Sequence, residues 1–491
     1  MTPETSIYLH IPFCLHRCAY CDFNAYAGQE DSIPAYVEAL IREIEFVGLS
    51  ASRHCEDREA RRRRGALPDE AIPAQGRGLL REDHPRNDET GEDARLPSPD
   101  FGRGVGGEGR VHTIFFGGGT PSLLSAYQLA SIMDALRANF AFTGDIEATL
   151  EANPGTTSPE FLRQIREAGI NRLSFGVQSA NPGELRMLER AHDFFDVIDS
   201  VKWARQAGFS NLNLDLIYGL PEQTLARWQN SVRRIVDLGP EHVSMYALTL
   251  EHGTPFGRWS AKGLLPLPNP DLAADMYEWA DEFLSANGYV QYEISNWARG
   301  VESRKSKVYS GDPRPSTFDS LPEFACKHNL QYWRNLPYLG LGAGAHGFAN
   351  GVRYSNVLRI KTYIERLTQY EIRNAGTQVD TYTGKQVSQY DFPLTPAVVN
   401  HHKLSEREQM QETMLTGLRL TREGVSDAAF RLRFGMGIAE AFPKEGDELL
   451  RLGLVEWVKQ ETSEVFETSE VLRLTSHARL VANQAFMRFV D

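Results

Sequence analysis

The fold is decided by one stretch near the start of the chain, Ser6-Ile-Tyr-Leu-His-Ile-Pro-Phe-Cys14-Leu-His-Arg-Cys18-Ala-Tyr-Cys21-Asp-Phe23. It holds three of the five cysteines, spaced Cys-x3-Cys-x2-Cys, directly after an apolar run that is typical of a β-strand. Zinc and ordinary iron–sulfur clusters take four protein ligands, whereas this loop supplies three. A 4Fe-4S cluster bound by Cys14, Cys18 and Cys21 would therefore keep one iron open to an outside ligand.

Three close cysteines are also compatible with different kinds of site. They could be buried thiols, a redox pair with a third cysteine beside it, or a zinc site completed by His10 or His16. A zinc-stabilised interaction protein and a cluster protein differ in their content of iron and sulfide, so chemical analysis separates these hypotheses.

Composition favours a soluble protein of the cytoplasm. The chain has 491 residues, 41% of them hydrophobic, and a formal net charge of −13, which argues against binding to nucleic acid or anionic membranes. We see no signal segment and no apolar run of about 20 residues, so we expect a protein that is not integral to a membrane. Few cysteines, mostly clustered, fit a reducing compartment.

Apolar, strand-like runs alternate with amphipathic helical segments over the first 300 residues, which predicts an α/β core with parallel strands. The predicted strands are 6–11, 112–116, 146–152, 172–177, 211–218, 242–250 and 289–295. The predicted helices are 34–46, 127–139, 159–168, 197–206, 225–238 and 271–286. Six or seven such units favour a partial (β/α)6-type barrel, with its site at the carboxyl ends of the strands.

We divide the chain into four regions: a core over 1–300, an insert over 301–325, a connecting region over 326–400 and a C-terminal domain over 401–491. A second insert, 51–110, interrupts the core, and its charge and shortage of aromatic residues predict disorder. The connecting region contains a glycine-rich stretch, 339–347, where backbone must approach something closely. The C-terminal domain shows helices, one of them N-capped by Ser426, and then two short strands, which predicts a small winged-helix-like α+β domain.

Polar residues interrupt or close several of the predicted strands. Gly118, Gly119 and Thr120 follow the second one, where glycine lets backbone approach a ligand without a Cβ clash. Three further positions place a carboxylate or an amide in an apolar run, where it needs a hydrogen-bonding partner, and a nearby arginine could pair with a carboxylate. These residues are Glu151, Gln178, Asp215 and Arg190. Taken singly, each could also satisfy neighbouring backbone or form an internal ion pair.

Together with the cysteine loop, these motifs resemble the radical S-adenosylmethionine (SAM) superfamily, in which the open iron of the cluster binds SAM. The runs Tyr8-Leu-His-Ile-Pro-Phe-Cys14, Gly117-Gly-Gly-Thr-Pro, Gly176-Val-Gln-Ser and Asp215-Leu-Ile-Tyr-Gly-Leu-Pro narrow the likeness to the oxygen-independent coproporphyrinogen III oxidase group. The likeness covers nearly the whole chain outside the two inserts. It implies a radical SAM barrel with SAM-binding residues at Tyr8, Gly118, Gly119, Thr120, Glu151, Gln178, Arg190 and Asp215.

That group contains oxidases and heme chaperones, whose sequences differ at positions that can be compared with this chain. Oxidases carry a further cysteine two residues after the cluster motif, where this chain has Phe23, and a long N-terminal extension, whereas thirteen residues precede Cys14 here. The chaperone branch, HemW, is marked by His-Asn-x-x-Tyr-Trp, and this chain reads Cys326-Lys-His-Asn-Leu-Gln-Tyr-Trp333. The resemblance is therefore stronger to the heme chaperones.

The His-Asn motif gives the expected heme site. His328 can ligate iron through a neutral imidazole, Tyr332 and Trp333 offer flat faces to a porphyrin, and Asn329 and Cys326 are further contacts. A His-Asn pair beside aromatic residues is also typical of a hydrogen-bonded corner of a core. We expect heme binding and transfer to an acceptor protein, a cluster–SAM unit with a structural, regulatory or redox role, an electron donor as a further partner, and no assigned catalytic residue. The alternative is an enzyme that abstracts hydrogen from porphyrinogen propionates and so drives oxidative decarboxylation.

Overall fold

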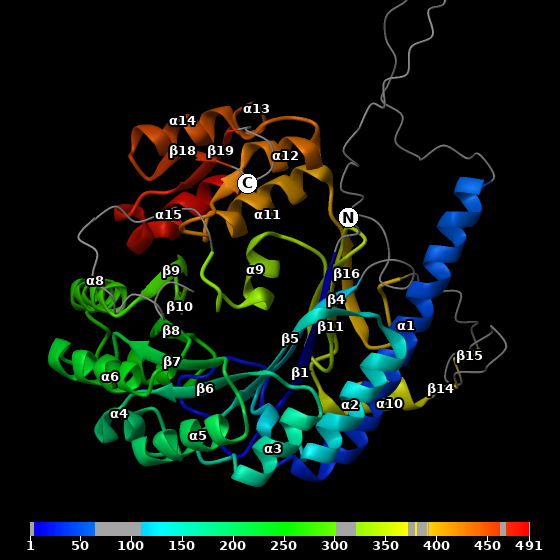
Figure 1. Cartoon of the computed structure of the whole chain (residues 1–491), viewed down its shortest axis with the longest axis horizontal. Helices are drawn as coiled ribbons and strands as arrows, with labels where there is room; N and C mark the ends of the chain where they lie inside the picture. The colour runs from blue at the N-terminus through cyan, green and yellow to red at the C-terminus, as the bar shows by residue number, and fades with distance from the viewer. Residues whose placement is uncertain are drawn as a thin grey trace, which may run out of the picture.

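The computed structural model describes residues 4–63, 110–300, 321–371, 379–380, 390, 392–461 and 468–490 (Figure 1). Residues 64–109 of the insert predicted over 51–110 lie outside these residues. So do residues 301–320 of the insert predicted over 301–325. The first insert begins later than the sequence suggests, because helix α1 (Ile33–Arg63) continues past Ala51. None of the helices in the described ranges has a segment long and apolar enough to cross a lipid bilayer.

Six parallel strands form the centre of the sheet that positions the site. They pair in the order in which they occur along the chain, as an open, curved array rather than a closed barrel. These strands are β1 (Thr5–Ile11), β4 (Val111–Gly118), β5 (Phe142–Ala152), β6 (Arg172–Gln178), β7 (Leu212–Tyr218) and β8 (His242–Ala247). All six were predicted, and the partial (β/α)6 architecture is confirmed.

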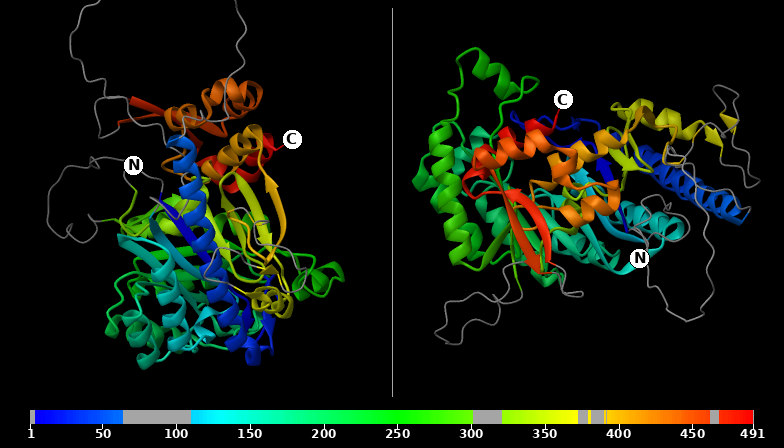
Figure 2. Two further views of the ribbon diagram at one scale, coloured as in Figure 1. Left: turned by 90° about the vertical axis from the view of Figure 1, so that its right-hand side faces the viewer. Right: turned by 90° about the horizontal axis from the view of Figure 1, so that it is seen from above.

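Helices cover the outer side of this array, as Figures 1 and 2 show. Besides α1 they are α2 (Ala126–Asn139), α3 (Pro159–Glu167), α5 (Phe194–Gln206), α6 (Leu225–Asp237) and α8 (Pro270–Ala286). Local signals define their ends: Ser158 caps the amino end of α3 through the Phe161 amide, and Gly169, at φ +105°, follows its last turn. Leu162 and Ile165 of α3 are fully buried, so packing against the sheet stabilises the helix that the caps delimit.

The remaining strands run antiparallel at both edges of the sheet, with one exception. At one edge, β10 (Asn296–Arg299) and β9 (Tyr289–Glu293) are antiparallel, so the prediction of a further parallel unit at 289–295 was wrong. At the other edge, β11 (Tyr338–Leu341) pairs parallel with β1 and is followed by antiparallel strands. These are β12 (His346–Ala349), β13 (Val352–Asn356) and β16 (Val398–Lys403).

The glycine-rich stretch forms β11, β12 and the tight turn between them. A Cβ on Gly340 would clash with the carbonyl of His346, and one on Gly342, at φ +100°, would lie 2.5 Å from the carbonyl oxygen of His10. The predicted close approach of backbone is therefore confirmed, and its partners are protein atoms.

A buried carboxylate on α1 fixes this turn against the rest of the fold. Glu43 is fully buried and accepts hydrogen bonds from the amide of Gly342 (2.8 Å) and the hydroxyl of Tyr363 (2.6 Å). It also accepts from Asn356 Nδ2 and Thr395 Oγ1, each at 2.8 Å. Burial raises the pKa of Glu43, and the four donors compensate for the lost hydration of its oxygens.

The C-terminal region has its own small core and sheet. Its described elements include α11 (Glu406–Gly417), α12 (Asp427–Phe434), α14 (Pro443–Arg451), α15 (Ala482–Phe486), and a sheet of β17 (Val425–Ser426), β19 (Thr468–Leu474) and β18 (Val455–Glu461). Ser426 caps α12 as predicted, because its hydroxyl accepts from the amide of Ala429 at 3.2 Å. Helices followed by a two-stranded hairpin agree with the winged-helix-like domain expected from the sequence.

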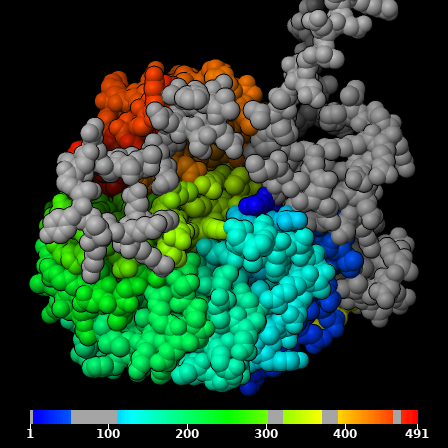
Figure 3. Space-filling model, viewed as in Figure 1, coloured from blue at the N-terminus to red at the C-terminus, as the bar shows by residue number. Residues whose placement is uncertain are grey.

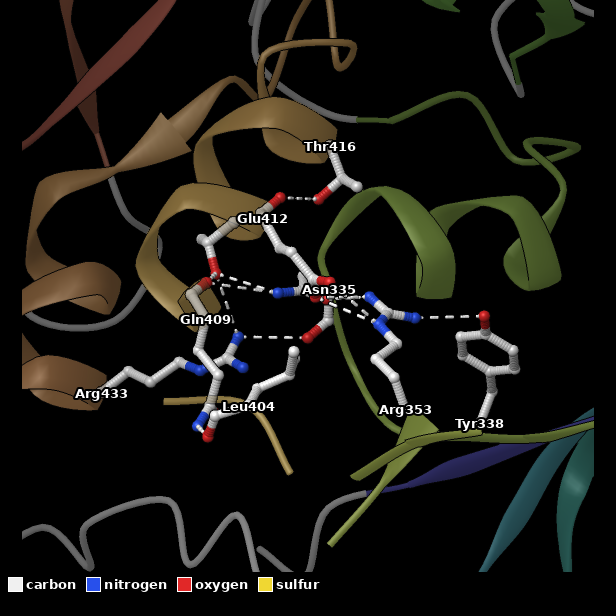
Figure 4. Close-up of polar contacts among 9 residues, drawn as sticks. Asn335, Tyr338, Arg353, Leu404, Gln409, Glu412, Thr416 and Arg433 are labelled. Atoms are coloured by element: carbon white, nitrogen blue, oxygen red, sulfur yellow. Dashed lines mark hydrogen bonds and ion pairs between the residues drawn. The ribbon is translucent and has the colours of Figure 1, made fainter. Parts of the chain in front are cut away.

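Polar contacts join this region to the sheet (Figure 4). Arg353 of β13 donates to both carboxylate oxygens of Glu412 on α11, at distances from 2.7 to 3.1 Å. The same guanidinium donates to Asn335 Oδ1 (2.9 Å) and Tyr338 Oη (3.1 Å). In Figure 3 the C-terminal surface adjoins that of the core where grey atoms do not cover the junction. The forked arginine thus fixes α11 above the antiparallel edge of the sheet.

Candidate functional site

A cavity of about 590 Å³ lies on the inner face of the parallel strands, a size typical of ligand sites. Alternation along the strands builds its wall: Leu9, Leu150 and Leu214 are buried in the core, while a neighbour of each in sequence lines the cavity, namely Tyr8, Glu151 and Asp215. All eight predicted SAM-binding residues line it, together with Cys14, Cys18, Cys21, His328, Asn329 and Tyr332.

The cysteine loop closes the cavity where the strands end. Cys14 lies in β2 (Phe13–Cys14), which pairs with β3 (Tyr26–Ala27) and so joins the two ends of the loop. Its Sγ accepts from Thr120 Oγ1 at 3.6 Å, and Cys18 Sγ accepts from Arg190 Nη1 at 3.7 Å. The four cysteines whose side chains the structure describes are free thiols, and burial raises the pKa of Cys21 to about 11.

The thiols do not surround a single point as the ligands of one metal ion do. Within the described residues, no three His, Cys, Asp or Glu side chains converge in that way. The loop nevertheless turns three sulfur atoms and two of their donor partners, Thr120 and Arg190, toward one space. This donor set suits an inorganic cluster, which spans more space than a single ion.

Glycines at the end of β4 bring the cysteine loop close to the strand. A Cβ on Gly118, at φ +113°, would lie 2.7 Å from His10 Nδ1, and one on Gly119 would lie 2.5 Å from the carbonyl oxygen of Phe13. The sequence predicted a close approach of these glycines to a ligand, and the structure shows a close approach to the base of the loop. The glycines therefore position the thiols as well as line the cavity.

Two carboxylates face the cavity between the thiols and the strands. Glu151 accepts from the amide of Gly118 at 3.1 Å, and Asp215 accepts from Asn213 at 2.7 Å and Ser174 at 3.1 Å. Burial and the charge of Asp215 raise the pKa of Glu151 to about 8, and burial also raises the pKa of Asp215. A ligand that donates hydroxyl or ammonium hydrogens would relieve this repulsion, so the residues fit the ribose and amino groups of SAM.

The raised pKa of Glu151 predicts a measurable dependence of stability on pH. Between its ordinary pKa of 4.5 and about 8, the folded protein keeps a proton that the unfolded chain releases, so this carboxyl makes stability fall as pH rises. Glu151→Gln removes that fall, and we expect the variant to gain on the order of 1–3 kcal/mol relative to the parent between pH 5 and pH 8. Urea unfolding at several pH values measures the difference.

The control for this comparison is Glu282→Gln, which changes an exposed carboxylate on α8. It should follow the parent at every pH. Equal pH slopes for Glu151→Gln and the parent would contradict a raised pKa at this position.

Two other predicted SAM residues have distinct geometries. Gln178 ends β6 at φ +65°, a conformation that is uncommon outside glycine. Arg190 is already engaged with protein: Nη2 donates to the carbonyl of Gly176 at 2.7 Å and to Asn153 Oδ1, while Nη1 contacts Cys18. Of its three nitrogens, only Nε is buried without a partner among the described residues. Arg190 therefore positions the cysteine loop, and its two terminal nitrogens are not free to bind a ligand carboxylate.

The His-Asn motif forms helix α9 (Lys327–Trp333), which closes the cavity near the amino ends of the strands, where His328 contacts Thr113 of β4. His328 is 1% exposed, and both of its ring nitrogens are engaged, Nδ1 with Thr113 Oγ1 (2.8 Å) and Nε2 with Tyr332 Oη (2.9 Å). Its ring stacks on Phe115 with centroids 5.0 Å apart. Burial lowers the pKa of His328 to about 3, so the imidazole is neutral at physiological pH.

Two predicted heme contacts lie outside the cavity. The ring of Trp333 packs against Arg419, whose guanidinium carbon lies 4.4 Å from the ring centroid. Cys326 is fully buried, and its Sγ lies 3.6 Å from Glu147 Oε1. Neither side chain lines the cavity. Glu147 of β5 accepts from the amides at the start of α9, at 3.2 and 3.3 Å, and so holds the helix in place.

Several residues that line the cavity were not singled out from the sequence. They include Phe115, Arg172, Ser174, Asn213, His242, Ser244 and Tyr246. A signal for some of them existed, since Arg172, Asn213 and His242 are polar residues at the beginning of apolar strands, as Glu151 and Asp215 are polar residues within them.

Comparisons with known proteins agree with this geometry. Residues 101–235 match the radical SAM superfamily, and residues 404–459 match the HemN C-terminal domain. The chain is 33% identical to heme chaperone HemW of Bacillus subtilis over 487 residues, 99% of each protein. It is also 33% identical to heme chaperone HemW of Escherichia coli over 347 residues, 70% of each.

A solved structure shows the same fold. Coproporphyrinogen III oxidase (HemN) from Escherichia coli, a radical SAM enzyme, superposes with a TM-score of 0.65 at 20% identity, covering 99% of this chain and 90% of that one. Identity at this level supports the fold alone, whereas the relatives above are similar along most of their length. The chain therefore belongs to the HemW family of radical SAM proteins.

Proposed function

We propose that the protein binds heme in the cavity and transfers it to an acceptor protein, and that Cys14, Cys18 and Cys21 hold a 4Fe-4S cluster that binds SAM. One observation carries the proposal: α9 brings His328, Asn329 and Tyr332 to the wall of the cavity that the three thiols close. Relatives of similar sequence are named heme chaperones, which favours the same cargo.

The residues around the thiols suit the SAM part of this proposal. A cluster with one open iron supplies a binding position for the amino and carboxylate groups of SAM. Glu151 and Asp215 accept hydrogen bonds from the ligand, and Gln178 offers an amide that makes no hydrogen bond to the described residues. Arg190 and Thr120 hold Cys18 and Cys14 in position through hydrogen bonds to sulfur.

His328 is the proposed ligand of heme iron. Thr113 Oγ1 donates to Ser6 Oγ at 2.6 Å, so it accepts from His328 Nδ1–H, and the lone pair of Nε2 takes the hydroxyl of Tyr332. Iron can bind Nε2 only after Tyr332 turns away. Tyr332 and Asn329 are then free to contact the porphyrin, whereas Trp333 and Cys326 are not part of the proposed site.

We place this activity in the cytoplasm, where a reducing environment keeps the three thiols available for a cluster. The partners that the proposal requires are a heme-accepting protein and, where the cluster changes its redox state, an electron donor. The net charge of −13 favours an acceptor that presents a cationic surface.

Anaerobic titration of the reconstituted protein tests the proposal. We expect a saturable Soret band with one heme per chain, and loss of that band when a heme-free globin is added, because the globin binds heme more tightly. Incubation with coproporphyrinogen III, SAM and a reductant should yield no vinyl product. Absence of heme binding, or formation of the vinyl product at enzymatic rates, would contradict the chaperone function.

A further inference from the structure

The cavity contains a buried guanidinium that forms no direct ion pair with the residues that the structure describes. Arg172, the first residue of β6, is 2% exposed and lines the cavity. Its side chain makes no ion pair and no hydrogen bond with the residues that the structure describes, and its Nε is fully enclosed without a partner. An arginine keeps its charge at any accessible pH, and a buried charge without a direct partner is unfavourable, so an anionic ligand would stabilise this side chain.

The acidic groups near Arg172 are engaged elsewhere. Both oxygens of Glu147 accept from the amides at the start of α9, and Asp215 is held by Asn213 and Ser174. Glu147, Asp215, Tyr292 and Cys326 act on the guanidinium only through space.

The neighbouring His242 does not accept a hydrogen bond from the guanidinium either. Both ring nitrogens of His242 are engaged, with Asn213 at 2.6 Å and Tyr292 at 2.8 Å. The residues within the described ranges therefore leave the guanidinium open toward the cavity.

Arg172 belongs to the end of the cavity that α9 closes. It stands opposite Thr149 of β5, at the start of β6, whereas Gln178 at the end of the same strand lies toward the cysteine loop. Its charge also contributes to the lowered pKa of His328. Arg190, which contacts Cys18, is the arginine beside the proposed cluster. The two arginines therefore serve opposite ends of one cavity.

We propose that Arg172 binds a carboxylate of the ligand received by α9, and that this carboxylate is a heme propionate. This inference rests on the proposed function, because heme supplies the ligand. A guanidinium presents two parallel N–H donors to a carboxylate, and such charge-assisted pairs are strong where water is excluded. With the iron near His328, Arg172 then fixes which edge of the porphyrin enters first.

The test compares heme with heme dimethyl ester, whose propionates carry no charge, in anaerobic titrations of the full-length protein. We expect the parent to bind the free acid at least about tenfold more tightly than the ester, as for a hydrogen bond to a charged group. Arg172→Met should bind both porphyrins equally and lose about the same factor for the free acid. Arg172→Lys should keep part of the preference.

The matched control is Arg205→Gln, which changes an arginine of α5 that is paired with Glu241 at 2.9 Å and lies outside the cavity. It should keep the full preference for the free acid. SAM affinity should be unchanged in Arg172→Met, and a parallel loss of SAM affinity would assign the carboxylate to SAM and overturn the propionate.

Failure of the two proposals gives different results. A parent that binds heme but does not distinguish the free acid from the ester overturns the role of Arg172 and leaves heme binding intact. If the parent, Arg172→Met and Arg172→Lys all prefer the free acid over the ester by the same factor, the role of Arg172 is overturned in the same way. A parent that binds neither porphyrin overturns the proposed function itself. If Arg172→Met does not fold, the parent and Arg172→Lys still decide the question.

Discussion

Replacing Cys18 with serine is expected to abolish assembly of the iron–sulfur cluster. Three thiolates are the full protein ligand set that this loop offers, and a serine hydroxyl does not ionise readily enough to replace one. Cys18 also accepts a hydrogen bond from Arg190, so the substitution disturbs the loop as well as the ligand set. Iron and sulfide analysis after anaerobic reconstitution should show less than about a tenth of the parent's content.

Cys326→Ser is the matched control for this experiment. Cys326 is fully buried against Glu147 and does not line the cavity, so the variant should retain its iron and sulfide. Full cluster content in Cys18→Ser, or equal losses in both variants, would contradict the assignment of the cluster to the loop. Adding SAM should change the absorption spectrum of the parent and of Cys326→Ser, and it should leave the spectrum of Cys18→Ser unchanged.

Replacing His328 with alanine is expected to shift or abolish the Soret band and to weaken heme binding by about tenfold or more. Because the pKa of His328 is lowered to about 3, protons do not compete with iron for Nε2 above about pH 4. Heme affinity that depends on this ligand should therefore be flat between pH 5 and pH 8. Optical titration measures both effects.

Tyr332→Phe should have the opposite effect from His328→Ala. The hydroxyl of Tyr332 occupies Nε2 at 2.9 Å, and breaking this bond costs about 0.5–1.5 kcal/mol, so its removal should raise heme affinity by up to about tenfold. Trp333→Phe, outside the cavity, is the control and should bind heme like the parent. An unchanged Soret band in His328→Ala would exclude this imidazole as the ligand. Equal losses of heme affinity in His328→Ala and Tyr332→Phe would point to the phenol of Tyr332 instead.

The parallel core could be predicted from the sequence because its signals are local. Apolar runs define β1 and β4 to β8, and glycines such as Gly169 mark the ends of helices through their left-handed backbone. The direction of β9 could not be predicted in this way, since its apolar pattern suits either orientation and depends on the pairing with β10.

The heme motif shows a second limit. His328, Asn329 and Tyr332 line the cavity while Trp333 does not. An α-helix turns about 100° per residue, so Trp333 lies about 140° around the axis from His328, which only the existence of α9 reveals. Arg172 could not be recognised from the sequence because its significance depends on which partners it lacks, and those follow only from the packing of β6 against its neighbours.

Strand β5 carries Glu147, which holds α9, and Glu151, which faces the thiols, four residues apart on the same side of one stiff strand. The two ends of the cavity therefore share a mechanical support. If bound SAM changes the affinity for heme by some factor, bound heme must change the affinity for SAM by the same factor. Cargo loading and cofactor loading in this fold are thus thermodynamically reciprocal, and measuring one coupling factor determines the other.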